Sequence, residues 1–316
     1  MVKKQNPDWN IRILEKPEEM EAAEELQRLV WPGSETDVVP LHVLVTVAHN
    51  GGVVIGAYLR NMPALDPQTA DPGADQPESL IGFVFGFPGL YFTPDGPRPK
   101  HCSQQLAVHP SYRNQGLGFL LKRAQWQMVR HQGLDRITWT YDPLLSRNAH
   151  LNISRLGAVC NTYLREVYGE MRDGLNTGLP SDRFEVDWWV NTRRVNRRLS
   201  KKVRSRLDLE HFLSAGAEIV NTSKFAGRDL PYPTEAKIPM IGSEPGVNVP
   251  LLLVEIPADI EAIKAEDHSL ASEWRLSIRH IFEDLFERGY LVTDFIHMPG
   301  DISRSFYVLS HGESTL

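Results

Sequence analysis

Cysteine is scarce in this sequence, and long apolar runs are missing. Only two cysteines, Cys102 and Cys160, occur in 316 residues. This excludes a disulfide framework or a cysteine metal cluster and suits a reducing compartment. No stretch approaches the roughly 20 apolar residues of a membrane-spanning helix, and residues 1–8 lack the apolar core of a secretory signal. We therefore expect a cytoplasmic protein without a membrane partner.

Familiar catalytic motifs and an excess of positive charge are missing as well. The sequence contains no G-x-S-x-G, H-E-x-x-H or G-x-x-x-x-G-K-[ST], so it does not support a hydrolase, a zinc protease or a P-loop protein. The net charge of −6 gives no general attraction to nucleic acid. A basic run at 193–206 has no interleaved aromatic residue, so we interpret it as a solvated helix that pairs with acidic neighbours. We expect no metal ion and no nucleic-acid partner.

The most informative stretch that is present covers residues 113–118, Arg-Asn-Gln-Gly-Leu-Gly. An apolar strand precedes it at 102–108, and apolar residues at helical spacing follow it. A strand, then glycines, then a helix N-terminus predicts an anion site, because the free amides of the first turn and the helix dipole both attract negative charge. At Gly116 a side chain would block phosphate oxygens, and at Gly118 the missing Cβ lets the helix lie close to its strand.

Together with residues 105–110, this stretch resembles the acyl-CoA pyrophosphate loop of the GNAT (Gcn5-related N-acetyltransferase) superfamily. The family pattern is an apolar strand, then V-x-P-x-x-[RQ]-x-x-G-x-[GA], then a helix. Every specified position is filled, by Val108, Pro110, Arg113, Gly116 and Gly118. The resemblance covers about residues 9–192, most sharply 102–160. It implies an α/β fold with a mixed central sheet and flanking helices, in which two parallel strands splay apart to admit the pantetheine arm.

The order of the expected elements agrees with that fold. We predict strands at 9–14, 53–59, 80–87, 102–108, 136–141, 158–168 and 184–191, and helices at 17–30, 40–50, 116–131 and 146–156. A proline-rich, acidic stretch at 61–79 is interpreted as a mobile insertion. Residues 1–192 are therefore predicted to form a GNAT acetyltransferase domain.

Residues 193–316 are predicted to form an α+β extension. Strands are expected at 251–256, 290–297 and 305–310, the last two as a candidate hairpin, with helices from about 259 and at 271–288 and an irregular stretch at 207–249. These strands could join the sheet of the first domain or form a small second lobe.

The resemblance assigns cofactor contacts residue by residue. It implies that the main chain of Leu106, Ala107 and Val108 pairs with pantetheine and polarises the acyl carbonyl. It implies further that the pyrophosphate is held by the amides of Arg113, Asn114, Gln115, Gly116, Leu117 and Gly118. Phe119, the next residue of the helix, and Asn148, in a later helix, are additional expected contacts with the coenzyme.

The catalytic groups stay unassigned. In the family a tyrosine often protonates the leaving thiolate, but that position holds Ile153, and Ser146 stands where an asparagine is usual. Strand 102–108 carries no carboxylate that could act as a base. Residues that could lie near the cleft, although each is more often structural, are His101, Asp142, Tyr163, Glu166 and Tyr168.

We therefore expect an acyl-CoA-dependent N-acetyltransferase, an acyltransferase with acetyl-CoA or another acyl-CoA as co-substrate and an amine of a small molecule as acceptor. The alternative is a non-catalytic acyl-CoA-binding protein, which the missing tyrosine and carboxylate favour. A protein lysine as acceptor and a homodimer are also left open.

Overall fold

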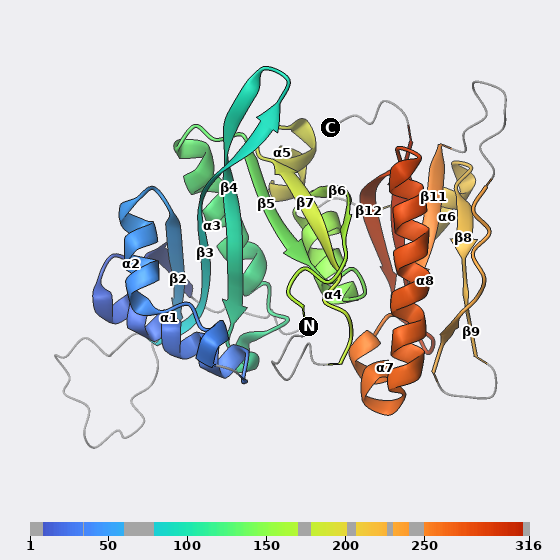
Figure 1. The fold of residues 1–316 in the computed structure, drawn as a ribbon, viewed down its shortest axis with the longest axis horizontal. Coiled ribbons are helices and arrows are strands. Elements are labelled where there is room, and N and C mark those ends of the chain that lie inside the picture. Colours follow the sequence, from blue (N-terminus) through green and yellow to red (C-terminus); the bar gives the residue numbers. More distant parts are fainter. Residues whose placement is uncertain are drawn as a thin grey trace, which may run out of the picture. The chain divides into compact units, whose positions relative to one another are not determined.

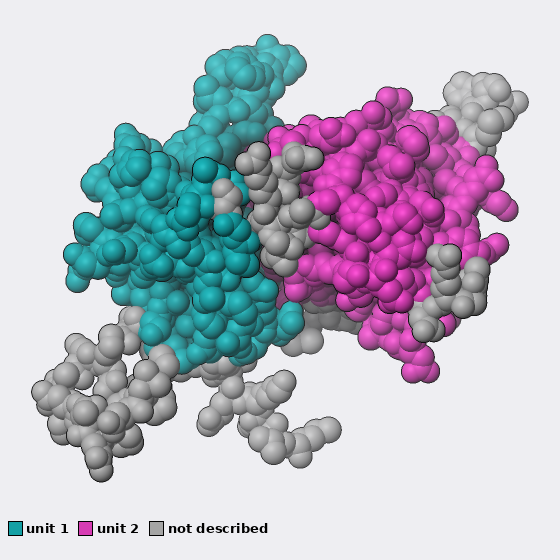
Figure 2. Space-filling view, turned by 60° about the horizontal axis from the view of Figure 1, so that its bottom comes forward, with its two compact units in different colours: residues 1–137, 172–175 teal, residues 138–171, 176–316 magenta. Residues whose placement is uncertain are grey.

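The computed structural model describes residues 9–33, 35–59, 79–169, 178–200, 207–225, 230–239 and 250–311 (Figure 1). They belong to two compact units, distinguished by colour in Figure 2. Unit 1 comprises residues 1–137 with 172–175, and unit 2 comprises 138–171 with 176–316. The domain boundary expected at 192/193 does not coincide with this division and stays a prediction. The expected insertion at 61–79 and the end of the basic run lie almost wholly outside the described residues.

In the described part of unit 1, antiparallel strands follow the order β1-β2-β3-β4. The strands are β1 (Trp9–Ile13), β2 (Val53–Leu59), β3 (Leu80–Thr93) and β4 (Gly96–Val108). The helices are α1 (Pro17–Val30), η1 (Glu35–Asp37), α2 (Leu41–His49), η2 (Pro110–Tyr112) and α3 (Leu117–His131). The predictions for α1 and β2 are confirmed to the residue, whereas the strands predicted at 80–87 and 102–108 are only the inner halves of β3 and β4.

The sheet of unit 1 is covered on both faces. On one face, α1 and α2 bury Met20 and Leu44 against Phe83 and other sheet residues. On the other face, α3 buries Leu117 and Leu121 against residues of β2 and β3. Successive apolar side chains of a strand therefore point to opposite faces of the sheet and pack in two separate core layers.

One extra residue in β4 changes which side chains share a face. Phe85 lies opposite Gln105, but its neighbour Gly86 lies opposite Ser103, so Gln104 has no partner in β3. This is the signature of a β-bulge, which bends a strand and re-aims its side chains. Beyond the bulge, Leu106 and Val108 pack on the α3 side, and Ala107 packs on the α1 side.

β5 (Arg136–Tyr141) begins at the end of unit 1 and lies mostly in unit 2. The parallel, splayed pair expected at the centre of the sheet involves strands of both units and stays a prediction. Unit 2 contains strands β6 (Val159–Leu164), β7 (Arg183–Trp189), β8 (Glu218–Asn221), β9 (Ser223–Lys224), β10 (Tyr232–Pro233), β11 (Leu251–Ile256), β12 (Leu291–Met298) and β13 (Arg304–Ser310). Its helices are α4 (Ser146–Ala149), η3 (His150–Arg155), α5 (Arg193–Leu199), α6 (Leu209–Ser214), α7 (Ile260–Glu266) and α8 (His268–Glu287).

The C-terminal strands extend the sheet that contains β6 and β7. The described order in unit 2 is β5-β7-β6-β12-β13-β11-β8, and Val292 of β12 pairs with Cys160 of β6. β12 and β13 form the expected hairpin. The strands of the extension therefore belong to the sheet of unit 2, and the choice between strands added to the first domain and a separate lobe stays a prediction.

The helix predicted at 146–156 is not regular. It starts as α4 and continues in η3 as a π-helical turn, in which the Leu156 amide donates to Leu151 O, five residues back. Gly157 follows with φ +81°, a conformation that side chains disfavour. Turns of this kind are often found at functional sites.

An aromatic cluster holds α8 against the sheet of unit 2. Phe184 of β7 lies 4.7 Å from Phe282 of α8 and 5.4 Å from Tyr307 of β13, measured between ring centroids. These edge-to-face contacts bury large apolar surfaces and add directional attraction. On the other face of this sheet, α6 contributes Phe212 to a second core cluster.

Candidate functional site

The loop between β4 and α3 is folded by local hydrogen bonds. Nδ1 of His109 accepts from the Ser111 amide at 3.2 Å, which caps η2. The amides of Tyr112 and Arg113 then donate back to His109 O and Pro110 O. The chain therefore turns sharply after β4 before α3 begins.

Left-handed backbone conformations prepare the start of α3. Asn114 has φ +63° and Gly116, the N-cap residue, has φ +89°. Asparagine and glycine are the residue types that adopt this region most readily. A Cβ on Gly116 would meet nothing within 4 Å, so the space beside it is open.

The amides of this loop have no backbone acceptor. In the described part of the chain, no backbone hydrogen bond is donated by any amide from Asn114 to Gly118. The first turn of a helix leaves such donors unpaired, and the helix dipole adds partial positive charge. Residues 114–116 are exposed. The loop therefore presents a row of donors to solvent at a positively polarised helix end, which is suited to a phosphate group.

The loop's side chains lie back against its own backbone. Nε of Arg113 donates to Val108 O at 3.3 Å, and Nε2 of Gln115 donates to Ser111 O at 3.2 Å. Arg113 therefore brings its permanent charge to the loop while bracing it to the end of β4.

α3 is held against the sheet by its first turn. Leu117 is buried in the core, so only its amide can serve a ligand. The structure shows α3 lying close to the sheet at Gly82 of β3. A Cβ at Gly82 would lie 3.0 Å from Ala107 O and 3.1 Å from Leu121 Cδ1. The role predicted for Gly118 in helix–strand packing stays a prediction, and Gly82 was missed because it is distant in sequence.

The model of the acetyltransferase (GNAT) family matches residues 18–151. Residues 18–151 belong to the GNAT acetyltransferase family. The GNAT segment runs from α1 to η3 and includes the β4–α3 loop, and the expected class, an acyltransferase with the GNAT fold, is confirmed. No curated protein sequence matches the chain significantly.

Several solved structures are similar to the chain. The first is NAA60 from Arabidopsis thaliana in complex with a bisubstrate analogue, with 17% identity, 58% of this chain and 99% of that chain covered, and a TM-score of 0.42. A putative GNAT acetyltransferase from Desulfovibrio desulfuricans has 16% identity, coverages of 58% and 99%, and a TM-score of 0.40. The putative acetyltransferase yncA from Salmonella typhimurium with acetyl-CoA has 15% identity, coverages of 58% and 94%, and a TM-score of 0.40.

The predicted cofactor residues fall into two groups. Leu106, Ala107 and Val108 end β4, and residues 113–119 follow in the same unit, so the structure brings these together. Phe119 is half-buried in the first turn of α3. Asn148 is half-buried in α4 of unit 2, and its proposed contact stays a prediction.

The positions considered for catalysis have structural partners. Ile153, at the expected tyrosine position, is fully buried in η3, and Ser146 shares a 2.8 Å hydrogen bond with Ser305. Tyr163 donates to Asp182 Oδ2 at 2.7 Å. Tyr168 is exposed, and its hydroxyl lies 2.8 Å from Thr140 Oγ1. Glu166 is also exposed, 3.8 Å from Arg279.

His101 belongs to a buried polar cluster in unit 1. Its Nε2 lies 3.1 Å from Gln125 Nε2, and Lys122 Nζ donates to Ser103 Oγ and Gln125 Oε1, both at 2.9 Å. Burial, with a contribution from Lys122, lowers the pKa of His101 to about 3. Burial also lowers the pKa of Lys122 well below its usual value. Burial therefore shifts the protonation of both side chains toward the neutral form. The sequence did not predict this cluster, because a single lysine in an amphipathic helix is usually exposed to solvent.

Unit 2 buries charged groups in a different way. Asp182 accepts from Nε and Nη2 of Arg279, both at 2.8 Å, and from the Glu166 amide at 3.1 Å. Burial acts against the ionised carboxyl, but the hydrogen bonds from Arg279 and Tyr163 hold the pKa of Asp182 below its ordinary value. The sequence carried no signal for this pair, because its members are 97 residues apart.

Arg275 shares this region with Asp142. Its Nη2 donates to Asp142 Oδ2 at 2.5 Å, and the side chain is almost fully buried. Its Nε and Nη1 have no hydrogen-bond partner among the described residues and no contact with solvent. Because a guanidinium does not lose its proton in a protein, Arg275 stays charged, and Asp142 is its carboxylate partner.

Two arginines of the basic run, Arg194 and Arg198, are turned inward, whereas Arg193 and Arg197 are exposed. In α5, Arg194 Nε donates to Gly157 O at 3.0 Å, and Arg198 donates to Ser154 O at 2.9 Å while pairing with Asp294. The predicted pairing with acidic neighbours is therefore present at Arg198. These arginines hold the end of η3 in place.

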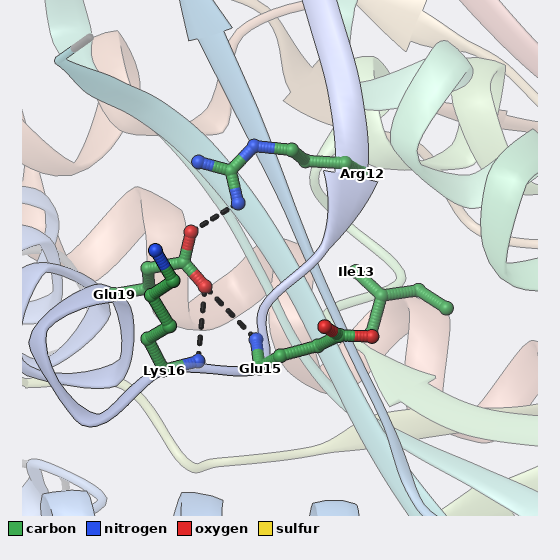
Figure 3. A pocket seen from close by; sticks show the side chains of 5 residues that line it. All are labelled: Arg12, Ile13, Glu15, Lys16 and Glu19. Carbon is green, nitrogen blue, oxygen red and sulfur yellow. Dashed lines mark hydrogen bonds and ion pairs between the residues drawn. The ribbon is translucent and has the colours of Figure 1, made fainter.

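A shallow depression of about 410 Å³ lies beside the start of α1 (Figure 3). It is lined by Arg12, Ile13, Glu15, Lys16 and Glu19. The Glu19 carboxylate accepts from the amides of Glu15 and Lys16 at 2.9 and 3.0 Å and pairs with Arg12. Its lining groups satisfy one another as a helix cap, so the depression has a structural explanation.

The described residues show neither a cluster of metal ligands nor a membrane-spanning helix. Among the described residues, no three His, Cys, Asp or Glu side chains gather as metal ligands would. Within the same residues, no helix combines the length and the apolarity that crossing a bilayer requires.

Proposed function

We propose that this chain transfers the acetyl group of acetyl-CoA to an amine of a small molecule. The family assignment supports acetyl transfer from acetyl-CoA. The acceptor class is the finer part of the proposal and is tested separately below; the net charge of −6 gives no general affinity for nucleic acid. The two free cysteines support a cytoplasmic location.

The observation that carries the proposal is the row of unpaired amides from Asn114 to Gly118. Five adjacent donors at an exposed helix N-terminus match the oxygens of a diphosphate. The open space beside Gly116 lets such a group approach the backbone. The coenzyme would supply the activated acyl carbonyl, and this loop would hold and orient it.

The main chain at the end of β4 completes the proposed coenzyme site. Leu106 and Val108 are anchored by side chains that pack toward α3, which leaves their backbone groups in a fixed direction. Fixed amide donors can orient a thioester and stabilise negative charge on its oxygen. The β-bulge at Gln104 sets the orientation of this last segment.

Two glycines at opposite ends of α3 allow a matched test of the loop. Gly116 and Gly133 have φ +89° and +77°, and a Cβ on either would meet nothing within 4 Å. Alanine at either position therefore costs about 1 kcal/mol of backbone strain. We expect Gly116→Ala to weaken coenzyme A binding, measured by calorimetry, at least about tenfold, which is about 1.4 kcal/mol, and Gly133→Ala to leave it unchanged. Equal binding by all three proteins contradicts the proposed loop.

The acceptor is tested separately, by thiol release from acetyl-CoA with a panel of small amines and a lysine peptide. Turnover with small amines and none with the peptide supports the proposal. Coenzyme binding without turnover on any amine supports the alternative, a non-catalytic acyl-CoA-binding protein. The buried Ile153 favours that alternative, because no hydroxyl is available where the family often places its acid.

A further inference from the structure

β3 and β4 continue beyond their neighbour as a two-stranded arm, residues 87–102. The pairing of β2 with β3 ends at Val53 opposite Gly86, whereas β3 and β4 stay paired as far as Thr93 opposite Gly96. Figure 1 shows this hairpin extending past β2. An isolated two-stranded ribbon is only marginally stable in water, so the arm requires contacts beyond its own strand pairing to stay folded.

The register fixes which main-chain groups of the arm point outward. Thr93 and Gly96 flank a two-residue turn, so they form a hydrogen-bonded pair. Because such pairs alternate with non-bonded ones, Leu90 opposite Pro99 and Phe92 opposite Pro97 are non-bonded. The two prolines agree with this assignment, since neither could donate to β3. The amides and carbonyls of Leu90 and Phe92 therefore point away from β4.

The outer edge of β3 is unprotected in this segment. Among the described residues, no strand other than β4 pairs with β3 beyond Gly86, and the amides of Leu90 and Phe92 donate to no backbone group. Residues 87–93, Phe-Pro-Gly-Leu-Tyr-Phe-Thr, carry no charge. The arm segment of β4 instead carries Pro97, Arg98, Pro99 and Lys100. Proline and charge are the devices that keep edge strands from pairing; β4 has both here, whereas this segment of β3 has one proline, Pro88, and no charge.

One face of the arm is apolar and exposed. Leu90 is 59% exposed and Phe92 is 82% exposed, although both are large hydrophobic side chains. The register places them on the same face as three exposed prolines, Pro88, Pro97 and Pro99. The opposite face is partly covered, since Arg136 stacks 4.6 Å from the Tyr91 ring. A contiguous apolar face of this kind marks an interaction surface.

We infer that the arm pairs with the arm of a second copy of this chain, through antiparallel alignment of the two β3 edges. A twofold axis at Tyr91 places Leu90 opposite Phe92 of the partner subunit, and each such pair exchanges two main-chain hydrogen bonds. No charges of like sign meet along this uncharged edge, and the apolar faces of the two arms become continuous. The contact is small, so the dimer dissociates on dilution.

Sedimentation velocity over a dilution series tests this inference with matched variants. Leu90→Pro removes an outward amide that the hairpin itself does not use, and Phe92→Lys places charge on the edge. We expect each to raise the dimer dissociation constant at least about tenfold, since each dimer loses two hydrogen bonds or gains two repelling charges. Arg98→Gln, on β4, is the control and leaves the constant unchanged. Unchanged melting curves show that the variants fold.

A disulfide probe tests the register. Across the twofold axis Tyr91 forms a non-bonded pair with its equivalent, about 4.5 Å between Cα atoms, which suits a disulfide. Tyr91→Cys should therefore be cross-linked by mild oxidant, and the wild type, which has Cys102 and Cys160, should not. A wild type that is monomeric at every concentration overturns the inference, as does a dimer that both edge variants retain. Dimer formation is measured without coenzyme A, so this test can fail while the proposed function holds, and the reverse is also true.

Discussion

Both units bury basic side chains, but of different types and with different partners. In unit 1, Lys122 is 2% exposed and donates to the neutral oxygens of Ser103 and Gln125. In unit 2, Arg275 and Arg279 lie against the carboxylates of Asp142 and Asp182.

The difference follows from the chemistry of the two cations. A lysine can give up its proton when burial makes the charge costly, whereas a guanidinium cannot. The lysine therefore tolerates neutral partners, and the arginines require carboxylates. The free energy of unfolding should therefore depend on alkaline pH through Lys122 of unit 1, and it should fall when a carboxylate of unit 2 is removed.

The largest expected effect is in unit 2. Asp182→Asn leaves Arg279 charged and buried without its bidentate partner, so we expect the free energy of unfolding to fall by about 3–5 kcal/mol. Urea denaturation at neutral pH measures this. A change below about 1 kcal/mol would contradict the importance of the buried pair.

The same carboxylate should make unit 2 sensitive to acid. The pKa of Asp182 is depressed in the folded state, so its stabilising contribution is complete above the unfolded pKa of about 3.9 and is lost as the pH falls through the folded value. The drop in stability on acidification should be smaller in Asp182→Asn than in the wild type. Equal drops would contradict the prediction.

An intermediate effect is expected at Lys122. Between its lowered folded pKa and about 10.4, the unfolded chain holds a proton that the folded chain lacks. The free energy of unfolding should therefore rise with pH in this window, by at most about 1.4 kcal/mol per pH unit. Lys122→Met should remove this slope, and Lys16→Met, at an exposed position, should not. Ser103 still donates to Gln125 in the variant, so the cluster stays satisfied.

The smallest effect is expected at the surface pair of Arg165 and Glu283, the control for the buried arginines. Its geometry is also bidentate, with both bonds at 2.6 Å, but Arg165 is 57% exposed. Glu283→Gln should lower the free energy of unfolding by no more than about 1 kcal/mol, because solvent screens the charges. A loss as large as that of Asp182→Asn would show that burial is not what separates the two pairs.

Helices, strands and loops could be predicted where neighbouring residues in the sequence determine them. Proline at the start and acidic residues in the first turn located α1, and β-branched runs between glycines located β2. The anion loop was visible because its two glycines, its arginine and the amphipathic helix after them are contiguous in sequence. The outer half of β3 was missed, since Pro88 and Gly89 normally end a strand, and here the hairpin partner sustains it.

Distant pairings could not be predicted in the same way. The pairing of Val292 with Cys160, which joins the C-terminal strands to the sheet of β6 and β7, has no signal in either strand. The bulge at Gln104 depends on register against β3. The candidate bases were proposed because they could lie near the cleft, but only packing shows that Tyr163 donates to Asp182 and that His101 is buried beside Lys122.

The amino-acid sequence by itself determined the order of the elements, the loop that ends β4 and the family to which residues 18–151 belong. These depend on neighbours within about one helical turn or one strand. Only the tertiary structure decided which buried cations meet carboxylates, which strands extend the sheet of unit 2 and which edge of the arm is open. Those outcomes depend on contacts between residues far apart in the chain, where burial and register, and not composition, set the energy.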